Sequence, residues 1–240
     1  MATDSPDDTI PDAALGADDQ KTPESKLVAT KRAWAREGRL LTGAQADPDR
    51  ARPAAARPRL PPGQRLVTNW PVLDLGILPE VGTDDWTLTV DGLVDHPFTW
   101  RWADFQDQPA FSDTSDIHCV TSWSRYDNQW QGVSAGHVVA LARPQADAAH
   151  VLLHSYDGYT TNLSLAAFSA ADVLLATTWQ GQPLTREHGG PVRLVVPQAY
   201  FWKSAKWLRR IQFVNDDTPG FWEVRGYHNE GDPWTEQRYG

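Results

Sequence analysis

The chain contains a single cysteine, Cys119, in 240 residues. One thiol cannot form an intramolecular disulfide, and it falls short of the ligand set of an iron–sulfur cluster or a closed zinc site. Three uses remain for Cys119: a buried filler, a catalytic nucleophile, or one thiolate ligand to a metal whose other ligands come from a cofactor. Which of the three applies decides what the protein does.

Length and charge exclude several classes of protein. A chain of 240 residues forms one large domain or two small ones. Its formal net charge of −9 argues against nucleic-acid binding, which requires a basic surface. No stretch approaches the roughly 18 apolar residues of a membrane helix, so we expect no stable membrane insertion. The acidic, proline-containing start is not a secretory signal, and we expect a cytoplasmic location.

Composition divides the chain into three parts. Residues 1–23 are rich in Asp and poor in large apolar groups, which predicts a disordered acidic leader. Residues 24–63 are expected to form one amphipathic helix, from Glu24 to about Arg39, followed by an extended arm rich in Pro and Arg. Residues 64–240 are expected to form the folded domain.

The expected elements of this domain are short and mixed. Because they lack a regular strand–helix–strand alternation, they predict an α+β fold. Ser164 is expected to cap one helix. Strands are expected at Trp86–Val90, Ile117–Val120, Val151–His154, Arg193–Pro197 and Ile211–Val214, and short helices at Trp102–Phe105, Ser134–Ala142 and Leu165–Leu175.

A basic block lies between Arg186 and Arg210, where six Lys or Arg residues accompany one acidic residue. Two glycines after His188 allow backbone amides to approach a ligand closely. Arg193 and Lys206 are then placed to clamp a phosphate, the first as a planar fork and the second as a point charge. A basic run is more often simply a solvated face, and His188 serves equally well to stabilise a turn.

Two other features have an ordinary and a functional interpretation. His118 precedes Cys119, and side chains alternate along a strand, so the two should point to opposite faces and not form an adjacent catalytic pair. The twelve tryptophans favour core packing, with a carbohydrate platform as the alternative.

Several ordered segments together resemble the sulfite oxidase-like molybdopterin oxidoreductases, in their short stand-alone prokaryotic branch. The likeness runs from about Leu60 to Tyr239. Its strongest segments are Leu60–Gln64, Asp116–Thr121, Gly158–Asn162, His188–Pro197, Tyr200–Trp207 and Pro219–Asn229.

The resemblance implies a mixed α+β molybdopterin-binding domain with Mo-molybdopterin as its cofactor. The cofactor would supply two sulfur ligands and Cys119 the third, which accounts for the single thiol. The resemblance further implies that the cofactor contacts Asn69, Trp70, His118, Ser155, His188, Arg193, Lys203, Ser204, Ala205 and Lys206.

The resemblance also implies the reaction. We expect oxygen-atom transfer on a small molecule of the sulfite, S-oxide or N-oxide type, with Cys119 and Arg125 as the catalytic residues. Arg125 is the one candidate for the substrate-binding arginines of typical sulfite oxidases, and neither their haem domain nor their dimerisation domain is expected here. No haem or flavin motif is present, so electrons would be exchanged with a separate partner. The alternatives are a hydrolase with Cys119 as nucleophile and a non-catalytic module that binds an anion or sugar.

Overall fold

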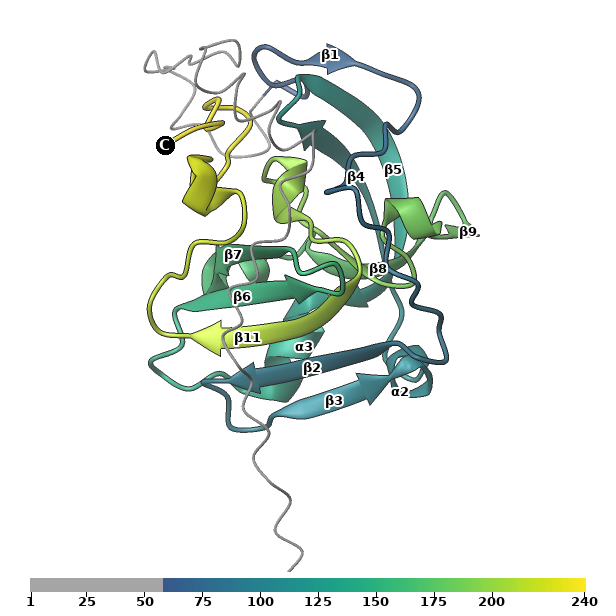
Figure 1. The fold of residues 1–240 in the computed structure, drawn as a ribbon, viewed down its shortest axis with the longest axis vertical. Helices are drawn as coiled ribbons and strands as arrows, with labels where there is room; N and C mark the ends of the chain where they lie inside the picture. The colour runs from purple at the N-terminus through teal and green to yellow at the C-terminus, as the bar shows by residue number, and fades with distance from the viewer. Residues whose placement is uncertain (1–57) are drawn as a thin grey trace, which may run out of the picture.

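Two β-sheets form the core of the protein (Figure 1). The computed structural model describes residues 58–240. The six-stranded sheet contains β1 (Arg65–Leu66), β5 (Trp123–Ser134), β8 (Leu174–Trp179) and β10 (Arg193–Val195) in this order, with β4 (Phe111–Cys119) beside β5 and β9 (Gln182–Pro183) beside β8. The five-stranded sheet has the order β3 (Phe98–Arg101), β2 (Thr87–Gly92), β11 (Leu208–Val214), β6 (His150–Ser155) and β7 (Thr160–Ser164).

The helices are short. The α-helices are α2 (Trp102–Gln106), α3 (Ala135–Ala142) and α4 (Leu165–Phe168), and the 3-10 helices are η3 (Arg186–His188), η4 (Phe201–Lys203) and η5 (Glu223–Arg225). Ser134 caps α3 by accepting a hydrogen bond from the His137 backbone N–H, and Ser164 caps α4 in the same way. Within the described range, no helix is long and apolar enough to cross a membrane.

Alternating side chains explain the second sheet. In β2 the side chains of Leu88 and Val90 are fully buried while their neighbours are partly exposed, as expected for a strand with one face on the core. Ile211 and Phe213 of β11 are buried in the same way, and β11 pairs with β2 in parallel. The α+β class is therefore confirmed, and each of the five predicted strands overlaps an observed one, although β4 begins at Phe111, well before the predicted start at Ile117. The strands β3, β5 and β7 have no predicted counterpart.

The predicted helix at residues 165–175 is wrong over most of its length. Only Leu165–Phe168 is helical, and β8 begins at Leu174. Leu174, Leu175 and Ala176 are all buried, because β8 lies between β5 and β10. A short apolar run does not distinguish a buried strand from a buried helix, and here strand pairing on both sides decided the outcome.

The described part of the predicted arm packs on the domain. Arg59 donates two hydrogen bonds to the carboxylate of Asp116 and also pairs with Asp127. The Trp234 indole donates to the carbonyl oxygen of Pro58 at 2.7 Å. The predicted leader 1–23 and the helix from Glu24 lie outside the described residues. The boundary at residue 64 stays a prediction.

The β4–β5 hairpin positions the single cysteine. Cys119 ends β4, Trp123 begins β5, and the Ser122 amide donates to the Cys119 carbonyl at 3.0 Å to close the turn. Ser122 adopts the left-handed conformation, with φ of 68°. The chain thus reverses within a few residues immediately after the thiol.

Replacing Gly132 by Ala should destabilise the protein by about 3 kcal/mol, because an added Cβ would lie 1.9 Å from the Leu175 carbonyl oxygen where β5 meets β8. Gly136 in α3 is the matched control, since a Cβ there meets nothing within 4 Å. Gly136→Ala should be neutral or stabilising by up to about 1 kcal/mol. Urea unfolding of both variants measures the difference, and equal midpoints would contradict the close approach of the strands.

Candidate functional site

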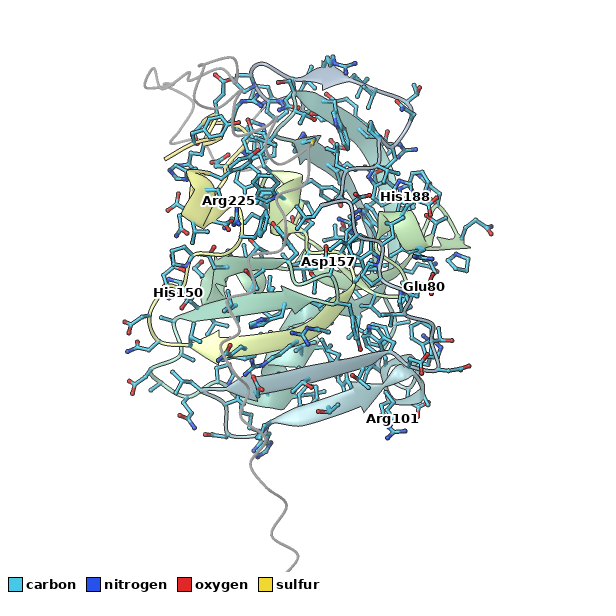
Figure 2. All side chains as sticks on the ribbon, in the orientation of Figure 1. Glu80, Arg101, His150, Asp157, His188 and Arg225 are labelled. Atoms are coloured by element: carbon cyan, nitrogen blue, oxygen red, sulfur yellow. The ribbon has the colours of Figure 1, made fainter. Side chains whose placement is uncertain are left out.

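One cavity of about 120 Å³ is lined by residues of the six-stranded sheet and by the loops and turns around it, including the turn between β6 and β7. Cys119 and Val120 come from the β4–β5 hairpin, while Asp157 follows β6. His188 ends η3, and Figure 2 shows it with Asp157 at the level where the sheets meet. The loop from Trp70 to Leu75 forms another wall. Segments distant in the sequence therefore converge on one hollow.

The Cys119 side chain faces this cavity but is only 6% exposed. Its sulfur lies 3.2 Å from the Thr121 hydroxyl oxygen, and its backbone carbonyl accepts a hydrogen bond from the Gln64 side chain. A thiolate at the wall of a cavity has the soft character that suits a heavy transition metal. The interpretation of Cys119 as inert filler does not account for its place on a cavity wall.

His118 points to the other face of β4, as strand alternation predicts. Its Nδ1 lies 2.8 Å from the Ser124 hydroxyl, and its ring packs edge-on against Trp234. Burial lowers the His118 pKa to about 4, so the ring is neutral at physiological pH. The structure does not bring His118 to the cavity that Cys119 lines, and the two do not form a catalytic pair.

The opposite end of the cavity carries two cations. Arg193 is 2% exposed and donates to the backbone carbonyls of His188 (2.7 Å) and Ser204 (2.9 Å). Burial lowers its pKa to about 9. Lys206 donates to the Glu187 carbonyl at 2.8 Å, and burial followed by repulsion from Arg193 lowers its pKa to about 8. Neither cation forms an ion pair with a carboxylate of residues 58–240.

A buried arginine beside a half-buried lysine is unfavourable unless negative charge lies close by, and Asp74, Asp157 and Glu187 of the cavity lining supply part of it to Lys206. The ring of His188 stacks on Trp70 with centroids 3.9 Å apart, and its Nε2 donates to the Trp70 carbonyl. Burial is the main cause that lowers the His188 pKa. The anion site that the basic block predicts stays a prediction.

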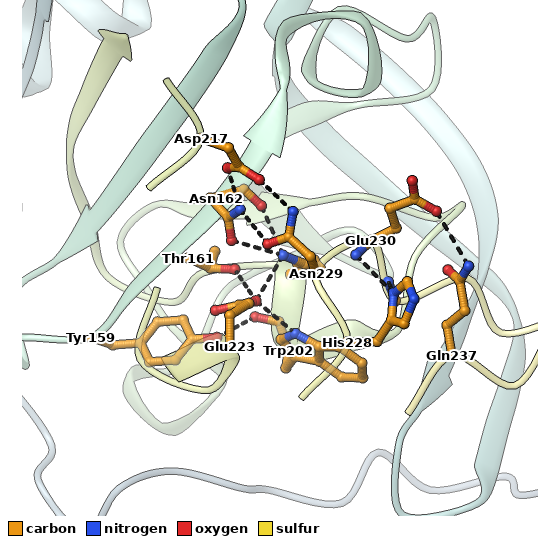
Figure 3. Close-up of polar contacts among 12 residues, drawn as sticks. Tyr159, Thr161, Asn162, Trp202, Asp217, Glu223, His228, Asn229, Glu230 and Gln237 are labelled. Atoms are coloured by element: carbon orange, nitrogen blue, oxygen red, sulfur yellow. Dashed lines mark hydrogen bonds and ion pairs between the residues drawn. The ribbon is translucent and has the colours of Figure 1, made fainter. Parts of the chain in front are cut away.

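Lys203 does not belong to this site. Its ammonium is fully buried and pairs with Glu223 at 2.7 Å, while it donates to the backbone and side-chain oxygens of Asn162 at 2.9 and 3.0 Å (Figure 3). These bonds use all three of its protons. The same Glu223 oxygen accepts hydrogen bonds from Thr161 and Trp202. Lys203 thus fixes η4 to Glu223 and Asn162 and has no donor left for a ligand.

The other predicted residues divide in the same way. Trp70 and Ser204 line the cavity, whereas Asn69 and Ala205 do not. Ser155 is buried beside the turn that carries Asp157, and its hydroxyl has no hydrogen-bond partner in the part of the chain that the structure describes.

Arg125 is also directed elsewhere. Its guanidinium lies over the Trp179 ring at 4.6 Å and donates to the Thr68 carbonyl and the Asn128 side chain. Arg125 does not line the cavity. The predicted role in substrate binding therefore has no geometric support.

An aromatic wall near Cys119 was missed by the sequence reasoning. Trp202, Trp222 and Tyr227 line the cavity together, and the Tyr227 ring lies 5.1 Å from Trp202 and 4.8 Å from Trp222. Burial raises the Tyr227 pKa above its ordinary range, and Tyr239 and, to a smaller extent, Cys119 raise it further, so the phenol keeps its proton. The signal available in the sequence was the cluster of aromatic residues after Tyr200, which was interpreted as core packing.

Comparison with known proteins gives consistent matches. The family model described as "Oxidoreductase molybdopterin binding domain" matches residues 75–222. The protein named uncharacterized oxidoreductase YuiH of Bacillus subtilis (strain 168) is 50% identical over 182 residues, which are 75% of this chain and 92% of that protein. Mitochondrial sulfite oxidase of Rattus norvegicus is 35% identical over 109 residues, which are 41% of this chain and 20% of that protein.

A solved structure has a similar fold. The sulfane dehydrogenase SoxCD from Paracoccus pantotrophus superposes with a TM-score of 0.54 at 21% sequence identity, and covers 59% of this chain and 41% of its own. This similarity shows that the two proteins share a fold. The chain thus spans nearly all of the Bacillus protein but under half of the other two.

Lys206 should make the stability of the ligand-free protein depend on pH. Because burial lowers its pKa to about 8 from 10.5, the unfavourable charged form is present below pH 8, and the penalty disappears as pH rises from about 8 to 10.5. Lys206→Met should therefore stabilise the ligand-free protein by about 1 kcal/mol at pH 7 and by less at pH 9.5. Urea unfolding at both pH values measures this difference.

Pyrophosphate should raise the melting temperature of the wild type at pH 7 more than that of Lys206→Met. An equal effect on both proteins would show that Lys206 does not take part in anion binding.

Proposed function

Because the chain belongs to the oxidoreductase molybdopterin-binding domain family, in its sulfite oxidase-like group, we propose that it transfers an oxygen atom to or from a small neutral S-oxide or N-oxide type of molecule. The chain is an oxidoreductase, and its cofactor is Mo-molybdopterin. The reaction, the substrate, the site residues and the electron partner are proposed below.

One observation carries the proposal: a single cavity is lined by the only thiol of the chain and by two cations, Arg193 and Lys206, that form no ion pair with a carboxylate of the described residues. The donor set fits the cofactor, because a soft thiolate suits its metal and the cations suit its phosphate.

When bound, the cofactor supplies two-electron oxygen-atom transfer at its molybdenum. Cys119 holds the metal, and the turn after it fixes the direction of the thiolate. Arg193 and Lys206 hold the phosphate, the first through a guanidinium whose direction two backbone carbonyls set. His188, stacked on Trp70, forms the wall between these two ends.

The Cys119 end of the cavity favours a neutral substrate. Its lining is Val120, Trp123, Trp222 and Tyr227, which excludes water and offers one hydroxyl donor. The protonated Tyr227 phenol is placed to donate a hydrogen bond to a substrate oxygen. An anion such as sulfite would need a free cation here, and the Arg125 guanidinium is directed to Trp179 and Thr68 instead.

Electrons are exchanged with a separate carrier in this proposal, since the 240 residues contain no haem or flavin motif. A cytoplasmic location is part of the same proposal. Cell fractionation would check the location.

Wild-type protein from a host that makes molybdopterin should contain about one molybdenum per chain, and Cys119→Ala should contain almost none. Elemental analysis of the purified proteins measures both. Cys119→Ala should keep its melting temperature within a few degrees, because the thiol is small. Molybdenum absent from the wild type in a competent host would overturn the proposal.

The substrate class is tested by kcat/KM for an uncharged sulfoxide and for sulfite with an artificial electron carrier. The sulfoxide should be preferred at least about tenfold, and Tyr227→Phe should lower kcat for it by about 10²-fold. Arg125→Gln is the matched control, and it should change either value less than about threefold. A preference for sulfite that Arg125→Gln abolishes would show that the substrate is an anion bound by Arg125.

A further inference from the structure

A buried arginine reaches the cysteine turn from a distant part of the sequence. Arg238 is 1% exposed, and its Nη1 donates to the backbone carbonyl of Val120 across 118 residues. The same nitrogen lies 3.4 Å from the Ser122 hydroxyl. Figure 1 shows the yellow end of the chain beside the end of the β4–β5 hairpin, where this contact is made. Arg238 therefore binds the backbone of Val120, the residue that follows Cys119.

The Cys119–Ser122 turn needs contacts from outside the turn to stabilise it. Ser122 has a φ of 68°, a conformation that costs a residue with a Cβ roughly 1 kcal/mol. One backbone hydrogen bond closes the turn, from the Ser122 amide to the Cys119 carbonyl, and the Cys119 sulfur lies 3.2 Å from the Thr121 hydroxyl. The Gln64 side chain supports it from one side through the Cys119 carbonyl. Arg238 supports it from the other side through Val120.

The segment that carries Arg238 also holds the aromatic wall. Tyr239 forms a β-bridge with Tyr227, and their rings lie 5.1 Å apart. The Gly240 amide donates to the Gly226 carbonyl at 3.3 Å, on the other side of the same bridge. The segment Glu236–Gly240 thus connects the thiol turn to Tyr227, the two features that face each other across this end of the cavity.

The electrostatic environment of Arg238 distinguishes it from an ordinary structural ion pair. Its nearest carboxylate is Glu236, at 3.7 Å, and its guanidinium lies over the Tyr200 ring at 5.0 Å. Its Nε and Nη2 have no hydrogen-bond partner among residues 58–240. A fully buried guanidinium held this loosely is costly if its role is stability alone.

We infer that Arg238 is a positioning residue that sets the direction of the Cys119 thiol through the Val120 carbonyl. The inference rests on the proposed function, in which this thiol is the metal ligand. Both contacts come from Nη1, and the planar guanidinium holds this nitrogen rigidly beside the Val120 carbonyl and the Ser122 hydroxyl. A lysine at this position would keep the charge but not the planar group that fixes the direction of its donors.

The test uses the full chain with Arg238→Met and Arg238→Lys, purified from a host that makes molybdopterin. The matched control is Arg210→Met in the second sheet, where a partly exposed arginine pairs with Asp91 at 3.0 Å, away from the cavity. Because Cys119 is the only cysteine of the chain, the mass added on reaction with iodoacetamide reports the reactivity of this side chain alone. Molybdenum per chain and melting temperature are measured on the same samples.

Arg238→Met should increase the alkylation rate of Cys119 at least about fivefold and lower the molybdenum content, at temperatures well below its melting point. Arg238→Lys should lie between Arg238→Met and the wild type, and Arg210→Met should match the wild type in both measurements. A merely stabilising role would lower the melting temperature of Arg238→Met without changing alkylation or metal content, and that result would overturn the inference.

This design distinguishes failure of the proposed function from failure of the inference about Arg238. Absence of molybdenum from the wild type would contradict the proposed function. The comparison of alkylation rates needs no metal, so it would still decide whether Arg238 positions the thiol.

Discussion

The strict alternation of side chains at the end of β4 is the constraint on which the site depends. Because neighbouring residues in a strand point to opposite faces, Cys119 enters the cavity while His118 is buried behind it. The hairpin turn follows at once and keeps the thiol at the rim of the sheet. A shift of one residue in the β4–β5 register would exchange these two side chains and leave the cavity without the thiol that we propose as the metal ligand.

The cavity lining combines charged and apolar groups. Arg193 and Lys206 form no ion pair with a carboxylate of the described residues, which supports the proposed phosphate site. Near Cys119 the lining is aromatic and includes a protonated phenol, Tyr227. A ligand with a phosphate at one end and metal-bound sulfurs at the other matches both environments. The same apolar end favours a substrate without charge.

Buried basic residues serve three different purposes in this protein, although all look alike in the sequence. Lys203 is neutralised by Glu223 and supports the chain behind the cavity. Arg193 is the proposed phosphate ligand, and the carbonyls of His188 and Ser204 fix the direction of its guanidinium. Arg238 spans from one end of the domain to the turn after the thiol. The identity of the partner, rather than the residue type, decides between these roles.

The residues by themselves determined the α+β class, the strand that carries Cys119 and the opposite direction of His118, because each follows from local periodicity. They also indicated the anion site, since Arg193 and Lys206 lie close together in one basic block. Only the tertiary structure decided that residues from Leu174 form a strand, that Lys203 and Arg125 point away from the cavity, and that Tyr227 and Arg238 meet the thiol turn. These outcomes depend on partners tens to more than a hundred residues away, which local periodicity does not specify.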